Sequence, residues 1–184
     1  MGPANPLYTE PTGWPASMVG IPYDALDNWR SVYPTETFVA QMQKVADGFA
    51  AGCELLQKAV AVSKGKYRKQ LTDDLGRART VGIHCASSAN QARFTEARNR
   101  LLTSTDRDER RRYIDTMRRA AEAEAELTAD LLPIVRNDPT IGYESSNHYF
   151  YVPQDLLEKQ LNIRYVLDWL DRQAEPRNSE TFQQ

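Results

Sequence analysis

Residues 36–60 decide the fold class, because they read ETFVAQMQKVADGFAAGCELLQKAV. Apolar side chains recur here at spacings of three and four, which places them along one side of a helix of about seven turns. These side chains are Phe38, Met42, Val45, Phe49, Cys53, Leu56 and Val60. The pattern stops near residues 63–65, where Ser63 and Gly65 are typical of a helix end.

Two further helices are expected directly after this one. The second covers about residues 66–102, and Gly76 and Gly82 are places where it could break or bend. The third begins within residues 103–108, where Thr105 and Asp108 have the spacing of a helix capping box. Pro133 is expected to end or kink this helix, because proline lacks the backbone N–H that a helix interior needs.

The ends of the chain differ from this helical middle. Residues 1–34 contain many prolines, which interrupt helices, and also tryptophans and tyrosines, in which a disordered tail would be poor. We therefore expect an extended arm that packs on the body. Pro153 is expected to open a last helix, since the first helical turn tolerates proline. Residues 175–184 are polar and are expected to fray.

Together these patterns predict an all-α fold. We expect an antiparallel helical bundle of three to four long helices in one domain over residues 35–174, with the extended, Pro- and aromatic-rich N-terminal arm over residues 1–34. A chain of 184 residues suits a single domain of this kind.

Composition narrows the function classes. The net charge of −2 argues against general electrostatic binding to nucleic acid. No apolar run approaches the ~20 residues that span a membrane, and no signal peptide is visible, so a cytoplasmic location is the default expectation. Cys53 and Cys85 have neither zinc-binding nor redox spacing. Phosphate-loop and dinucleotide-binding motifs are absent, and we expect no cofactor and no metal.

The connection over residues 136–152 is the most unusual stretch. It combines aromatic and short polar side chains, namely Tyr143, Glu144, Asn147, His148, Tyr149, Phe150 and Tyr151. Aromatic faces can stack on a sugar ring while polar groups bond its hydroxyls, and Glu144 with His148 could act as an acid and a base. The alternative is that the aromatic residues only anchor a long loop and the polar groups satisfy its backbone.

A polar face in the second helix is the other anomaly. His84, Ser87, Ser88, Gln91 and Arg98 share this face, whereas Asn90 and Arg93 are expected to lie away from it. Three interpretations stay open: a solvated face, a buried hydrogen-bond network that receives the 138–152 loop, or a ligand site.

The third helix carries charges that need an explanation. Glu124 interrupts its apolar stripe, so it must reach water, pair with a base such as an arginine, or belong to a site. Its other charges are expected to form solvated faces. These are Glu122, Glu126, Asp130 and the arginines Arg107, Arg110, Arg111, Arg112, Arg118 and Arg119.

Three stretches resemble a known kind of protein. They are WRSVYP at residues 29–34, HCASSANQARF at 84–94, and DPTIGYESSNHYFY at 138–151 followed by DLLEK at 155–159. They resemble the C-terminal helical region of large bacterial proteins of glycoside-hydrolase type, over about residues 14–170. In such proteins the catalytic domain lies upstream, so the resemblance implies that this chain lacks most of the active site.

The resemblance and the loop together predict an accessory helical domain of a carbohydrate-active enzyme, inactive alone, that braces a catalytic domain and offers part of a sugar site. The expected substrate-binding residues are Tyr143, Asn147, Tyr149, Tyr151, Gln91, Arg98 and His84, and the catalytic candidates are Glu144 and His148. The expected partners are a carbohydrate and either an upstream catalytic domain or a second copy. The alternatives are a non-enzymatic interaction or oligomerisation module and an RNA-contacting bundle that uses residues 107–119.

Overall fold

The computed structural model describes residues 2–15, 24–28, 30–142 and 151–174. Within these ranges the chain forms a short 3-10 helix and four α-helices, and no strand is present. The elements are η1 (Leu26–Asn28), α1 (Thr35–Val62), α2 (Gly65–Thr103), α3 (Arg107–Asn137) and α4 (Pro153–Ala174). The predicted all-α fold is therefore confirmed, and α4 begins at Pro153 as expected.

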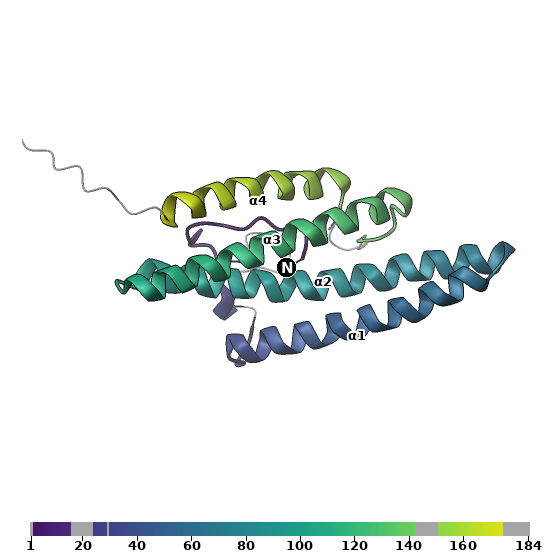
Figure 1. Ribbon diagram of the computed structural model, residues 1–184, viewed down its shortest axis with the longest axis horizontal. Helices are drawn as coiled ribbons and strands as arrows, with labels where there is room; N and C mark the ends of the chain where they lie inside the picture. Colours follow the sequence, from purple (N-terminus) through teal and green to yellow (C-terminus); the bar gives the residue numbers. More distant parts are fainter. Residues whose placement is uncertain (1, 16–23, 29, 143–150, 175–184) are drawn as a thin grey trace, which may run out of the picture.

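The helices form a bundle-like row in which each packs on the next in the chain. Contacts join α1 to α2, α2 to α3, and α3 to α4. Short turns at residues 63–64 and 104–106 reverse the chain between the first three helices. Figure 1 shows α1 and α4 at opposite sides of this row, with α2 and α3 between them.

Local expectations at the two glycines, at Pro133 and at the cap of α3 can be compared with the structure. The helix α2 runs through both glycines without a break, and a bend there stays a prediction. Pro133 lies inside α3, which continues to Asn137, so the proline does not end the helix, and the expected kink stays a prediction. Pro133 and Ala129, whose carbonyl loses its helical partner, are both exposed, so water can satisfy that carbonyl. The cap of α3 is Asp106, whose side chain accepts the backbone N–H of Glu109 at 2.8 Å, one position later than predicted.

The hydrophobic core lies between α2, α3 and α4. One cluster packs Phe94 and Leu101 of α2 against Met117 of α3 and Ile163 and Leu170 of α4. A second cluster lies nearer the other end of α3 and α4 and contains Ile83, Leu131, Val135, Ile141, Tyr151 and Leu156. These two clusters hold three of the four long helices together.

The N-terminal segment, residues 2–15, contributes to this core without regular secondary structure. Leu7 is buried in the first cluster. Its N–H donates to Asn162 Oδ1 at 2.7 Å, and its carbonyl accepts from Asn162 Nδ2 at 2.9 Å. Buried backbone groups need such partners, and here side chains of the helices supply them. In Figure 1 this segment runs beside α3 and α4.

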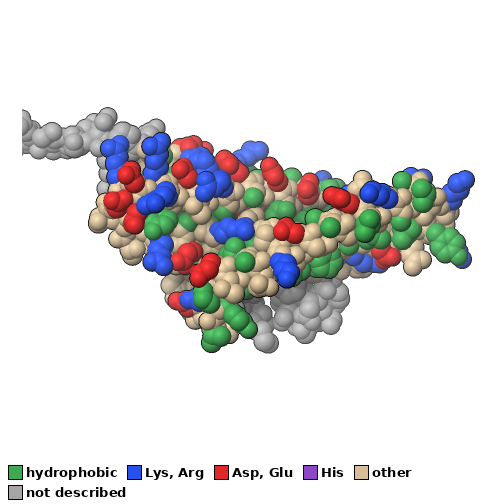
Figure 2. All heavy atoms as spheres, turned by 60° about the horizontal axis from the view of Figure 1, so that its bottom comes forward, with side chains coloured by type: hydrophobic (Ala, Val, Ile, Leu, Met, Phe, Trp, Pro, Cys, Tyr) green, Lys and Arg blue, Asp and Glu red, His purple; other side chains and the backbone are tan. Residues whose placement is uncertain are grey.

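The helix α1 differs from the other three in how little of it is covered. Only Ala46 and Cys53 are buried in its 28 residues. The rest of its predicted apolar stripe is half-buried or exposed, and Val45 is 42% exposed. Figure 2, which brings the α1 side forward, shows green hydrophobic side chains on the surface between charged ones. The apolar stripe of α1 is thus predicted by sequence, and the fold covers it only in part, where α1 packs on α2.

Candidate functional site

The polar face of α2 is buried, so its interpretation as a solvated face is wrong. Ser87, Gln91 and Arg98 are all at most 3% exposed. Asn90, which we expected to lie away from this face, is buried as well. The face is covered by α3 and by the N-terminal segment, and Tyr151 of the 138–152 loop contacts its His84 end.

Glu124 is the centre of the buried network. Its carboxylate accepts hydrogen bonds from Ser87 Oγ at 2.8 Å, Asn90 Nδ2 at 3.3 Å and Gln91 Nε2 at 3.4 Å. Lys159 Nζ of α4 lies 3.1 Å from Glu124 Oε2, and both side chains are fully buried. A carboxylate that accepts from this many donors has the bonding pattern of an ionised group. The structure thus pairs Glu124 with a lysine, where the sequence had suggested an arginine.

The same network anchors the N-terminal segment. Gln91 Nε2 donates to the carbonyl of Gly2 at 2.6 Å, and Lys159 Nζ donates to the carbonyl of Asn5. Burial lowers the pKa of Lys159, while the Glu124 carboxylate acts in the opposite direction and offsets part of this effect. Because each of these polar groups has a protein partner, the network ties α2, α3, α4 and the N-terminal segment together.

Arg98 lies further along α2 and has a different set of partners. Its Nη1 lies 2.9 Å from Asp24 Oδ2, and it also donates to the carbonyls of Tyr8 and Glu10. Burial raises the pKa of Asp24, but hydrogen bonds from Thr12 and Arg98 outweigh it, so the pKa lies below its ordinary value. The substrate-binding role of Arg98 stays a prediction, and in this structure its guanidinium binds protein groups.

His84 and Tyr151 form a third contact, which is partly buried. The Tyr151 hydroxyl contacts His84 Nδ1, and the ring centroids are 5.9 Å apart. Burial lowers the pKa of His84 and raises the pKa of Tyr151, so a neutral imidazole and a neutral phenol share this hydrogen bond at neutral pH. A Cβ on Gly2 would lie 3.0 Å from His84 Nδ1 and 3.1 Å from the Tyr151 oxygen, which explains the glycine there.

The structure thus brings some predicted site residues together and separates others. His84 meets Tyr151, and Gln91 meets Glu124, whereas Arg98 belongs to a separate cluster with Asp24. The other predicted residues lie outside the described ranges, and the sugar site stays a prediction. These residues are Tyr143, Glu144, Asn147, His148 and Tyr149.

Sequence reasoning missed two buried charges. Lys159 lies on the apolar face of α4, between Leu156 and Ile163 in the row that is buried. A lysine at such a position indicates that an acid lies opposite, and this could have been inferred from the sequence alone. Asp24 had no comparable signal, because it lies outside the long helices.

Other chemistry-bearing groups do not converge in the described part of the chain. No group of three or more His, Cys, Asp or Glu side chains there could hold a metal ion. Both cysteines are free, and burial raises the pKa of Cys85, which keeps its thiol protonated. Among the described helices, none combines the length and apolarity that crossing a membrane requires.

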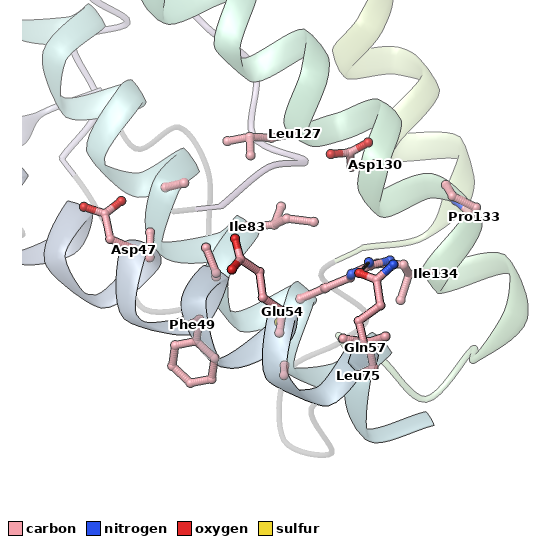
Figure 3. Close-up of a pocket in the computed structure, with 18 of the residues that line it drawn as sticks. Asp47, Phe49, Glu54, Gln57, Leu75, Ile83, Leu127, Asp130, Pro133 and Ile134 are labelled. Carbon is pink, nitrogen blue, oxygen red and sulfur yellow. Dashed lines mark hydrogen bonds between the residues drawn. The ribbon is translucent and has the colours of Figure 1, made fainter. Parts of the chain in front are cut away.

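A large open groove lies on the other side of α2. It has a volume of about 820 Å³, with α2 as its floor and α1 and α3 as its walls. Its apolar lining includes Ala46, Cys53, Leu75, Ile83, Ala86, Leu127 and Ile134. Figure 3 shows Glu54 reaching from α1 toward the α3 side, with Asp130 on the opposite wall. Asp47 also lines the α1 wall, and the main cation in the lining, Arg79, donates to Gln57 Oε1 at 3.0 Å.

Comparison with known proteins adds no identification. No protein-family model, curated protein or solved structure matches this chain. The functional argument therefore depends on the residues and the geometry given above.

Proposed function

We propose that this protein is a non-enzymatic helical interaction module. In this proposal it is an antiparallel bundle that is closed on the α2–α3–α4 side, where the N-terminal segment acts as a packed arm, and open on the α1 side. The observation that carries the proposal is the coverage of α1, in which only Ala46 and Cys53 are buried.

Burial differs sharply along the chain. The helices α2, α3 and α4 each place a long row of side chains in the core. In α1, by contrast, Leu55 is 66% exposed and Val62 is 81% exposed. Helices in water are stabilised mainly by packing of their apolar face, so a long helix with so little burial has capacity for further packing. Large exposed apolar areas are typical of protein-interaction surfaces.

Both sides of the contact between α1 and α2 are open. The 820 Å³ groove lies on the side of α3. A second hollow, of about 540 Å³, is lined by Lys44, Val45, Gly48, Phe49, Gly52, Leu56 and Ala78. A partner could therefore pack on α2 beside α1. The buried polar clusters, in contrast, already have protein partners.

This proposal is compatible with the expected accessory role. An accessory domain that braces a catalytic domain needs a docking surface, and the open α1 side would supply it. The sugar-contacting part of that role depends on residues 143–149 and stays a separate prediction from sequence.

The test is position-specific photo-crosslinking of the full chain in its own cells. A photoreactive amino acid replaces exposed Ala50 on the groove wall, and a matched control replaces exposed Asp168 on α4. We expect a discrete crosslinked product from position 50, identified by mass spectrometry, and none from position 168. The absence of a discrete product at position 50 at native expression would refute the interaction module.

A further inference from the structure

We propose that the groove between α1 and α3 binds a basic amphipathic helix of another protein. This inference rests on the proposed interaction function and specifies the chemistry of the partner. The groove runs along α1 from Gln43 to Gln57. At a rise of 1.5 Å per residue this stretch is about 21 Å long, which matches a helix of about 14 residues.

The shape of the groove suits a helix. The helices α1 and α3 each pack on α2 and make at most marginal contact with each other, so their facing sides remain apart. Several residues of the lining are small and leave room for a helix to approach, namely Ala46, Ala50, Gly76, Gly82 and Ala86. Packed helices approach to interaxial distances of about 8–10 Å, and small residues at the contact permit the shorter end of that range. A fourth helix there would cover the open side of α1, α2 and α3.

The charges of the groove indicate which charges a bound helix carries on its two edges. Glu54 and Asp47 lie on the α1 wall and Asp130 on the α3 wall, against the single guanidinium of Arg79. The acidic row continues on α3, where Glu126 precedes Asp130 by one turn and is exposed. Both walls are therefore acidic, while the floor on α2 is apolar apart from Thr72 and Arg79. Such a surface is complementary to a helix with an apolar inner face and lysine or arginine on both edges.

A second copy of this chain is a poorer occupant. Outside α1, an exposed apolar row lies on α4 and consists of Leu157, Leu161 and Tyr165. Exposed Glu158 and Asp168 accompany that row against one exposed arginine, Arg164, so two carboxylates would meet the acidic walls. Like charges brought together at an interface oppose binding, so the charge pattern favours a different protein.

The test uses two designed helical peptides and the full chain. Both peptides have the same leucine and alanine positions on one face; one has lysine on both flanks, and the other has glutamate. Fluorescence anisotropy measures their binding. We expect the basic peptide to bind roughly tenfold more tightly or better, and its affinity to fall as salt screens the rim charges.

Variants locate the binding. The double variant Glu54→Lys, Asp130→Lys should reverse the preference toward the acidic peptide. The matched control Glu158→Lys, Asp168→Lys makes the same change of net charge on α4 and should leave the preference unchanged. Ala50→Trp should block the basic peptide, with circular dichroism used to verify that the helices persist.

The outcomes separate this inference from the proposed function. Equal binding of both peptides, blocked by Ala50→Trp, would overturn the basic-helix inference and leave the groove as a docking site. A crosslink from position 50 to a second copy of the chain would overturn it in favour of self-association. Failure of both peptides to bind would also overturn it, while the crosslink at position 50 decides the interaction module independently.

Discussion

Replacing Lys159 by methionine is expected to be among the most destabilising single changes in this protein. Lys159 Nζ lies 3.1 Å from Glu124 Oε2, and neither side chain is exposed. At that separation and an effective dielectric constant of about 20, Coulomb's law gives roughly 5 kcal/mol of attraction before desolvation is counted. Lys159→Met retains much of the side-chain volume but leaves the carboxylate buried without its cation.

The expected loss follows from that uncompensated charge. Removing one member of a buried ion pair costs about 3–5 kcal/mol of unfolding free energy. A domain of this size has a total of about 5–15 kcal/mol, so Lys159→Met removes a large share of it. Ser87, Asn90 and Gln91 still donate to Glu124 in the variant, which places the loss within this range and not above it.

Urea unfolding followed by circular dichroism measures this loss. The matched control is Lys69→Met, because Lys69 also faces an acid, Asp73, at 2.8 Å but is 80% exposed. Exposed pairs contribute about 0–1 kcal/mol, so the control should change stability little. In the double variant Lys159→Met, Glu124→Gln we expect a coupling of about 1–3 kcal/mol, since the second change removes the stranded charge.

A loss in Lys159→Met no larger than that in Lys69→Met would refute this reasoning. It would mean that water or a rearrangement compensates Glu124 without the lysine. A double variant whose loss equals the sum of the two single losses would contradict the direct coupling of the pair.

Three further predictions concern the N-terminal segment, pH and the sugar hypothesis. Leu7→Ala should lower the unfolding free energy by about 2–5 kcal/mol, because Leu7 is buried in the core. The control Trp14→Ala should change the unfolding free energy little, because the Trp14 side chain is 69% exposed. Equal effects of the two changes in urea unfolding would contradict the packing of this segment. Burial lowers the pKa of His84 below 6.5 in the folded chain, so the unfolded chain binds more protons just below pH 6.5, and stability should fall as pH decreases through that region. Thermal melts should show this fall in the parent chain and less of it in His84→Asn. Plant-polysaccharide oligosaccharides should change the tyrosine and tryptophan fluorescence if the 138–152 loop binds sugar, and a response unchanged in His148→Ala and Tyr149→Ala would reject that site.

Local patterns were sufficient for the helices themselves. The spacing of apolar residues predicted α1, and Pro153 marked the start of α4. The errors were local too, since Asp106 caps α3 one position later than predicted and Pro133 is tolerated where its helix is exposed. Where a helix begins and ends depends largely on backbone hydrogen bonds and side chains within about four residues, and those are readable along the chain.

The partners of the buried polar residues depended on the tertiary structure. The polar face of α2 was visible in sequence, but three interpretations were open until its burial was known. Gln91 bonds the carbonyl of Gly2, 89 positions away, and Lys159 bonds that of Asn5, 154 positions away. Contacts at such separations leave no periodic signal in one sequence.

The helix α1 shows most clearly the difference between what the sequence determines and what the tertiary structure determines. Its repeat of apolar residues established that one face prefers to leave water, and this preference is a property of the residues alone. Which elements cover that face depends on how all the helices pack, and here α3, α4 and the N-terminal segment cover α2 and leave most of α1 open. Sequence therefore specified an amphipathic helix, while the packing of distant segments turned it into the wall of an open groove.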